Sequence, residues 1–245
     1  MIIDKGHKMA LSTKSGEIVQ LRLEINPKAR RLILRLDERQ REAVAVAPNK
    51  RALAEAVEFA KSRIDWMQTQ LEALPKPLHL AAGEQFQLRG APCFLSAEGT
   101  TRRAQLAPGP PQTLHLPGDL STLGQRALRY LRKAAREDLT LAVETYCRQL
   151  NVAVRRVSIK DTRSRWGSCT STGNLAFSWR LIMAPREVLD YVAAHECAHL
   201  LEMNHSSAFW AHVATCRPNW KQERRWLRQN GPSLHAVQVA PAKPI

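Results

Sequence analysis

The stretch "DYVAAHECAHLLEMNHSSAFW", residues 190–210, places three histidines, two glutamates and a cysteine in one mostly apolar segment. At its centre, "HECAH" is an HExxH pattern with His195 and His199 four positions apart. On an α-helix such positions are separated by about 40° around the axis, so the two imidazoles face the same way. Two imidazoles on one face can bind one zinc ion, and Glu196 between them can reach a water at the metal. The pattern therefore predicts a metal site on a helix.

A catalytic zinc site needs a third protein ligand, and the sequence offers more than one candidate. We favour His205, which reaches the metal if the helix ends near Met203 and the chain turns back. Asn204 is the residue best suited to the left-handed conformation of such a turn. Glu223, in "NWKQERRWL", is the competing third ligand, and Glu202 is a weaker one because we expect it to face solvent.

Other polar residues near the motif are candidates for supporting roles. Arg180, Tyr191 and His212 are alternative partners for the negative charge that develops on a substrate carbonyl. Trp166, in "WGSC", either lines the cleft or caps the core, and we favour the structural role. Cys197 lies about 200° around the helix from the first histidine, so we expect it to face the core.

The composition is that of a globular protein with an excess of basic residues. The chain has 245 residues, 44% of them hydrophobic and 24% charged. Lys and Arg number 37 against 22 Asp and Glu, a net charge of +15. Basic residues gather at 30–35, 126–136, 155–165 and 217–228. Such a charge predicts attraction to polyanions, with nucleic acid the first possibility, although a well-solvated basic surface explains it equally well.

The sequence also bears on cellular location. No run approaches the roughly 18 apolar residues of a membrane span, and the N-terminal residues lack the apolar core of a secretory signal. The five cysteines are scattered, with no CxxC pair, which argues against a disulfide framework. We therefore expect a cytoplasmic protein with no membrane partner.

Hydrophobic periodicity predicts the order of the elements. Strand-like runs at 17–25, 30–37 and 42–48 predict an antiparallel meander, and a helix over 51–74 follows. The Pro-rich segment 107–112 predicts a loop or a sub-domain seam. A long helix over 121–150, with Ser121 as its N-cap, precedes a strand at 154–161. The run "NLAFSWRLIM" (174–183) alternates, which predicts one half-buried strand with Ser178 and Arg180 on its polar face.

The segment "RWGSCTSTGNLAFSWRLIMAPREVLDYVAAHECAHLLEMNHSSAFW" (165–210) resembles the YgjP-like family of predicted metal-dependent hydrolases, relatives of the SprT-like and WLM zinc peptidases. The C-terminal half is closely similar, and the N-terminal half is similar only in general pattern. The resemblance implies one Zn²⁺ per chain, held by His195, His199 and His205, with Glu196 as the catalytic acid/base.

The resemblance also implies an α+β fold. The N-terminal β meander and helix would precede a zincin-like half, with the HExxH helix and an antiparallel edge strand, 174–183, along the cleft. We expect an N-terminal tail over 1–16, a β-rich region with one helix over 17–118, the zincin-like metallopeptidase region over 119–230 and a C-terminal tail over 231–245. Residues 17–230 would together form one YgjP-like domain.

The expected function is a zinc-dependent peptidase acting on peptide or protein substrates. Glu196 would take a proton from the attacking water and pass it to the leaving amine. The alternative is a nucleic-acid-associated zinc protein, either a DNA-linked protease or a binding module with structural zinc. Structural zinc sites are usually closed by four ligands, and three histidines leave one position open, which favours the enzyme.

Overall fold

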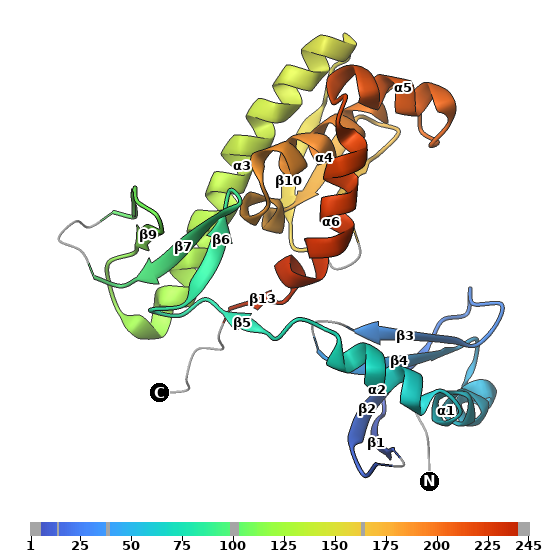
Figure 1. The fold of residues 1–245 in the computed structure, drawn as a ribbon. Coiled ribbons are helices and arrows are strands. Elements are labelled where there is room, and N and C mark those ends of the chain that lie inside the picture. The colour runs from blue at the N-terminus through green and yellow to red at the C-terminus, as the bar shows by residue number, and fades with distance from the viewer. Residues whose placement is uncertain (1–5, 14, 38–39, 99–102, 163–164, 240–245) are drawn as a thin grey trace. The chain divides into compact units, whose positions relative to one another are not determined.

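The computed structural model describes residues 6–13, 15–37, 40–98, 103–162 and 165–239 (Figure 1). The fold is of the α+β class, with β sheets in the N-terminal part and most of the helical residues in the C-terminal part. The chain divides into two compact units, Met1–Lys76 and Pro77–Ile245. This division falls well before the boundary at 118/119 that we expected from composition.

The N-terminal unit is built on a four-stranded sheet with the order β1-β2-β4-β3. Its strands are β1 (Lys8–Ser12), β2 (Ile18–Ile25), β3 (Ile33–Asp37) and β4 (Glu42–Ala47). The predicted meander is wrong, because β4 pairs in parallel with β2 and antiparallel with β3. Every residue of β4 is buried, which suits its place between two other strands. The segment expected as an N-terminal tail, 1–16, supplies β1.

Two helices replace the single helix predicted over 51–74. After the 3-10 helix η1 (Lys50–Ala52), α1 (Leu53–Lys61) and α2 (Ile64–Glu72) are separated at Ser62 and Arg63. The Ser62 hydroxyl donates a hydrogen bond to the carbonyl of Phe59, a local side-chain bond of the kind that competes with helix continuation. Apolar periodicity continues across such a break, so the sequence did not reveal it.

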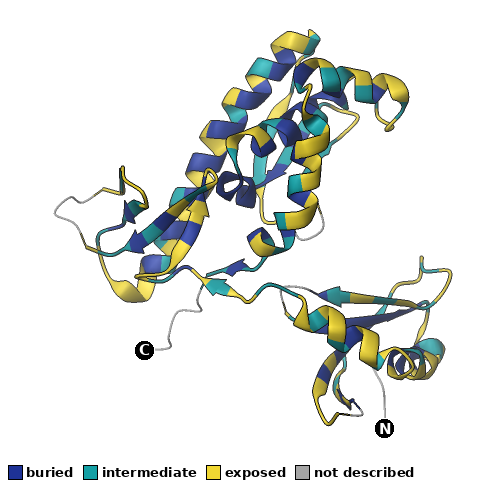
Figure 2. Cartoon of the chain, viewed as in Figure 1, coloured by how far each residue is buried: buried dark blue, intermediate teal, exposed yellow. Residues whose placement is uncertain are grey.

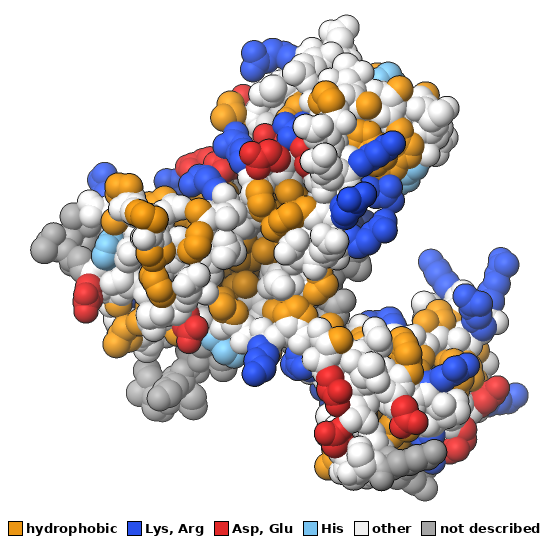
Figure 3. All heavy atoms as spheres, viewed as in Figure 1, with side chains coloured by type: hydrophobic (Ala, Val, Ile, Leu, Met, Phe, Trp, Pro, Cys, Tyr) orange, Lys and Arg blue, Asp and Glu red, His pale blue; other side chains and the backbone are white. Residues whose placement is uncertain are grey.

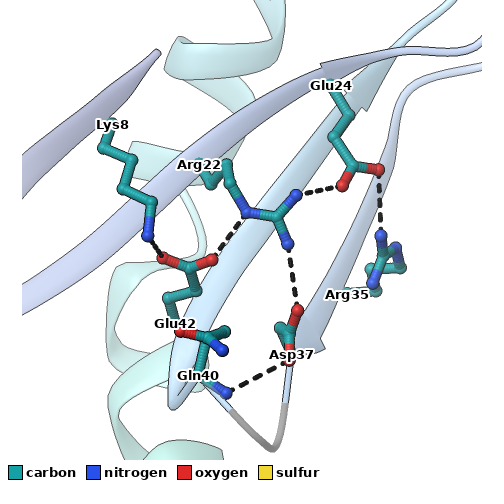
Figure 4. Close-up of polar contacts among 7 residues, drawn as sticks. All are labelled: Lys8, Arg22, Glu24, Arg35, Asp37, Gln40 and Glu42. Carbon is teal, nitrogen blue, oxygen red and sulfur yellow. Dashed lines mark hydrogen bonds and ion pairs between the residues drawn. The ribbon is translucent and has the colours of Figure 1, made fainter. Parts of the chain in front are cut away.

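A network of ion pairs joins the strands of this unit (Figure 4). Arg22 donates to Glu42 at 2.6 Å and to Asp37 at 3.0 Å, and it also pairs with Glu24. Lys8 lies 2.7 Å from Glu42, whose side chain is only 4% exposed. Burial alone would raise the pKa of Glu42, but the bonds from Lys8 and Arg22 outweigh burial, and the pKa lies below its ordinary value of 4.5.

We expect Glu42→Gln to destabilise the N-terminal unit by about 1–3 kcal/mol at neutral pH, because Lys8 and Arg22 lose a buried charged acceptor. The lowered pKa means that this stabilisation is present above pH 4.5 and is lost as the pH falls through the folded-state value. The amides in 18–47 should therefore be less protected from hydrogen exchange in the variant than in wild type at pH 7, and equally protected in the two proteins in acid. Equal protection at both pH values would contradict the prediction.

The first part of the C-terminal unit is a second four-stranded sheet followed by a long helix. The strands have the order β6-β7-β9-β8, and within the segment 107–112 residues 108–111 form the turn between the last residue of β8 and the first of β9. The elements are β5 (Leu78–His79), β6 (Gln85–Leu88), β7 (Ala91–Ser96), β8 (Gln105–Ala107), β9 (Gln112–His115), η2 (Leu120–Thr122) and α3 (Leu123–Leu150).

Helix α3 is the scaffold of this unit. Asp119, and not Ser121, caps the 3-10 turn that leads into it, by accepting a hydrogen bond from the Ser121 amide at 2.8 Å. Asn151 ends it in the left-handed conformation at φ 53°. Buried and exposed residues alternate along α3 in Figure 2. Its buried side packs against the helix α4 (Arg186–Ala198) and the 3-10 helix η3 (Trp179–Met183).

The second part holds the HExxH segment. Its elements are β10 (Arg156–Lys160), β11 (Gly167–Cys169), β12 (Asn174–Ser178), η3 (Trp179–Met183), α4 (Arg186–Ala198), α5 (Ser207–Cys216), α6 (Trp220–His235) and β13 (Val237–Gln238). The three-stranded sheet has the order β10-β12-β11, with β12 parallel to β10 and antiparallel to β11. The predicted edge strand, β12, is therefore central, and β10 and β11 are the edges of this sheet.

The strand predicted over 174–183 is wrong in its second half. The chain leaves the sheet after Ser178 and forms η3, and the Ser178 hydroxyl accepts a bond from the Arg180 amide at that point. Ser178 and Arg180 are buried and do not form a polar face. All residues of this 3-10 helix are buried. The alternation of apolar residues over 179–183 therefore does not mark one buried face of a strand.

The C-terminal segment expected as a tail, 231–245, is in part structured. Helix α6 continues to His235, and β13 pairs in parallel with β5, which places Val237 opposite Leu78. Of the helices in the described part of the chain, none has the length and apolar character needed to cross a membrane.

Candidate metal centre

Helix α4 carries the centre. It begins after Pro185, with Glu187 in the first turn, where the helix dipole favours a negative charge. Val188, Leu189 and Val192 are buried and fix the helix against the core. The last turn and the C-terminal end of α4 then present the HExxH motif.

The chain reverses more tightly than we expected. The helix ends at Ala198, with His199 as its C-cap, and not near Met203. Asn204 is not in the left-handed conformation; its side-chain oxygen accepts a bond from the Ser206 amide at 3.0 Å. Ser206 in turn accepts from the Phe209 amide and caps α5. The turn is therefore stabilised by hydrogen bonds to the side chains of Asn204 and Ser206, and not by a left-handed backbone at Asn204.

This reversal brings His195, His199 and His205 together. One ligand atom from each lies within 4.8 Å of the others. The Nε2 atoms of His195 and His205 are 3.2 Å apart. Two nitrogens bound to one tetrahedral zinc at about 2.0–2.1 Å are separated by about 3.3 Å, so this spacing fits a shared metal ion.

Hydrogen bonding and burial favour the ligand forms of these imidazoles. The Nδ1 atom of His199 lies 2.9 Å from the Glu202 carbonyl oxygen, which only accepts, so Nδ1 carries the proton and Nε2 keeps its lone pair. Burial, together with the neighbouring His199 and His205, lowers the pKa of His195 to about 3. Burial also lowers the pKa of His199 below its ordinary value of 6.5. Both histidines are thus neutral bases at physiological pH, as metal binding requires.

Glu196 lies buried beside the cluster, only 5% exposed. Burial raises its pKa to about 8, and the opposing effect of Arg165 is smaller. The carboxyl group fits only because residue 167 is glycine: a Cβ there would lie 2.6 Å from Cγ and 2.7 Å from Cδ of Glu196. The sequence did not reveal the contact between Gly167 and Glu196. The one indication of it was the presence of a glycine directly after Trp166 in "WGSC".

Aromatic rings surround the histidines. Phe209 lies 4.4 Å from the His199 ring, centroid to centroid, and Trp210 stacks on His205 at 5.8 Å. Tyr191 meets His195 edge-on at 5.9 Å, and burial raises the pKa of its phenol to about 12. These rings hold the imidazoles in place and exclude water from one side of the cluster.

Arg180 and Glu223 have other partners, and His212 lies outside the histidine cluster of the described chain. Arg180 binds Asp161 and donates to the Val237 carbonyl at 3.0 Å. Glu223, the competing ligand, is buried in an ion pair with Arg217. His212 is half-buried on α5 and, within the described residues, is not part of the histidine cluster.

Two further predictions concern packing. Trp166 packs on the His235 ring at 4.4 Å and against Gly231, in accord with the structural role that we favoured. Cys197 is fully buried, with its sulfur 3.7 Å from that of Cys147 on α3. The cysteine of the HExxH motif therefore faces the core and away from the histidines, as its position around the helix predicted.

Two imidazoles at the end of α4, a third from the turn that follows it and a buried carboxylate beside them form the kind of site found in metal-dependent hydrolases. A family model described as "YgjP-like, metallopeptidase domain" matches residues 30–230. The chain therefore belongs to the YgjP-like family, and it is a metal-dependent peptidase.

Among solved structures, the metallopeptidase zymogen abylysin of Pyrococcus abyssi is similar to part of the chain. The sequences are 21% identical, the TM-score is 0.35, and the match covers 37% of this chain and 93% of that one. No curated protein matches the chain.

Proposed function

We propose that the protein is a zinc peptidase in which His195, His199 and His205 hold one zinc ion and Glu196 is the general acid/base. The observation that carries the proposal is the spacing of 3.2 Å between the Nε2 atoms of His195 and His205, which matches two ligands of one ion. In the described part of the chain the cluster has three members, so a fourth position is left for water and substrate.

When bound, zinc supplies Lewis-acid chemistry, polarising a substrate carbonyl and making water more acidic. A carboxylate oxygen of Glu196 accepts the proton of the attacking water and then donates it to the nitrogen of the leaving amine. The raised pKa of Glu196 suits the second step, because it lets the carboxyl group hold the proton until the amine leaves. The first step needs the carboxylate form, which the positive charge of a bound zinc ion would favour. Gly167 leaves room for the carboxyl group.

The edge strand β11 is the proposed docking position for the substrate backbone. An extended peptide can add to an exposed sheet edge through main-chain hydrogen bonds. β11 pairs on one side with β12, and it lies at the end of the strand order. Its first residue, Gly167, contacts Glu196, so a peptide paired here would pass beside the proposed base.

Zinc analysis of variants tests the ligand set. We expect about one zinc per chain in wild type. In His205→Ala, zinc affinity should fall by well over about 100-fold, because loss of a direct ligand should cost more than the roughly 10–100-fold that loss of an outer-shell partner costs. His212→Ala is the matched control, because it removes a histidine from the neighbouring helix α5. Zinc retained at full stoichiometry and affinity in His205→Ala would exclude His205 as the third ligand.

A further inference from the structure

Outside the histidine cluster, a group of cationic side chains lines a pocket of about 500 Å³ in the C-terminal unit. The turn after β6, the segments flanking β8 and β9, and helix α3 form its walls. Five cationic side chains line it, from Arg89, Arg103, Arg126, Arg129 and Lys133. Glu137 is the acidic residue that lines it in the described chain. Lys and Arg side chains follow α3 in Figure 3.

Much of this charge is not neutralised by the protein. Arg89 is paired, because both oxygens of the buried Asp138 accept from it, at 2.7 and 2.9 Å. Among the described residues, Arg126 donates to two neutral groups, the Thr122 hydroxyl at 2.7 Å and the Leu116 carbonyl at 3.3 Å. It also interacts electrostatically with the exposed Asp119. Arg129 has no acidic partner within ion-pair distance among residues 6–239 that are described.

Lys133 adds further charge. It lies 3.7 Å from Glu137, and both side chains are more than half exposed, so water screens this pair strongly. The pocket therefore keeps a net positive field from Arg126, Arg129 and Lys133, which are spaced along one side of α3.

The pocket is also preorganised. The guanidinium of Arg126 is held against Gly118, where a Cβ would lie 2.7 Å from Nη1 and the backbone φ is +123°. The buried Nε of Arg126 has no hydrogen-bond partner in the described structure. Tyr130 lines the same pocket and offers a hydroxyl and a ring face. Arginines fixed in this way bind anions with little loss of side-chain freedom.

We propose that this pocket binds a small molecule carrying phosphate groups. Its volume falls within the range of roughly 300–1,000 Å³ typical of small-molecule sites. Guanidinium groups donate in pairs to phosphate oxygens, and several separate cations match an anion with more than one charge. The proposal concerns a site apart from the histidine cluster and does not depend on the proposed zinc chemistry.

Binding of inorganic pyrophosphate to the full-length protein, measured by calorimetry at fixed ionic strength, tests the proposal. We expect Arg129→Gln and Lys133→Gln each to weaken binding by at least about tenfold. Arg132→Gln and Arg136→Gln are matched controls, because they remove exposed cations from the same helix without touching the pocket lining. They should change binding less than about twofold. All four variants should keep wild-type zinc content.

Several outcomes would overturn the proposal. One is the absence of pyrophosphate binding at millimolar concentration. Another is an equal loss in the pocket variants and the controls, which would show a general effect of surface charge. Citrate that competes as well as pyrophosphate would remove the preference for phosphate. A single-stranded oligonucleotide that binds through Arg129 while pyrophosphate does not would assign the pocket to nucleic acid instead.

Discussion

Glu196→Gln should lower peptide hydrolysis by about 10²–10⁴-fold while the protein keeps its metal, because the amide can neither accept the water's proton nor hold it for the leaving amine. The substitution preserves side-chain volume, so the buried position beside Gly167 is still filled. Zinc content and thermal stability should therefore stay at wild-type values.

A proteome-derived peptide mixture, digested by wild type and by Glu196→Gln and compared by mass spectrometry, measures this loss and reports substrate preference together. Chelator-treated wild type is the second control, since it removes activity by a different route. Undiminished cleavage by Glu196→Gln would show that another group carries the proton. Absence of cleavage by zinc-loaded wild type would count against the proposed function itself.

Gly167→Ala should be nearly as damaging, although it changes no group that carries chemistry. The added Cβ would lie 2.6 Å from Cγ of Glu196, so either the carboxyl group or β11 must shift. A displacement of about 1 Å can cost about 100-fold in rate. The backbone of Gly167 is not in the left-handed region, so the loss would come from this contact and not from backbone strain.

Ser168→Ala is the matched control for this prediction. Ser168 is the next residue of β11 and points to the opposite face of the sheet. We expect kcat to fall in Gly167→Ala, with zinc content unchanged, and both to stay near wild type in Ser168→Ala. A Gly167→Ala variant with normal kcat would show that Glu196 does not need its present position.

The parts of the centre that depend on local spacing could be predicted from sequence. His195 and His199 are one helical turn apart, and Cys197 faces the other way, as their positions in the motif require. The approach of His205 was also expected, but its turn was not. Asn204 can reverse a chain through a left-handed backbone or through its side chain, and the sequence does not distinguish these two solutions.

The parts that depend on distant residues could not be predicted. Hydrophobic alternation predicts that a segment is a strand, but it does not say which strands are neighbours. It therefore could not reveal the parallel pairing of β2 with β4 or the central position of β12. Arg180 was a candidate for the oxyanion, and the sequence did not indicate its pairing with Asp161, which lies 19 residues away in the chain. Gly167 acquires its importance only when the fold brings Glu196 over it.

The pairing of β11 with β12 has a consequence beyond the sheet. Gly167 lies opposite Phe177 and Ser168 opposite Ala176. Sliding β11 by one residue would exchange its two faces and put a side chain, from Trp166 or Ser168, where Glu196 now finds space. Strand alignment is therefore a chemical requirement in this protein, because a slipped strand that forms a new ladder of hydrogen bonds would still expel the base.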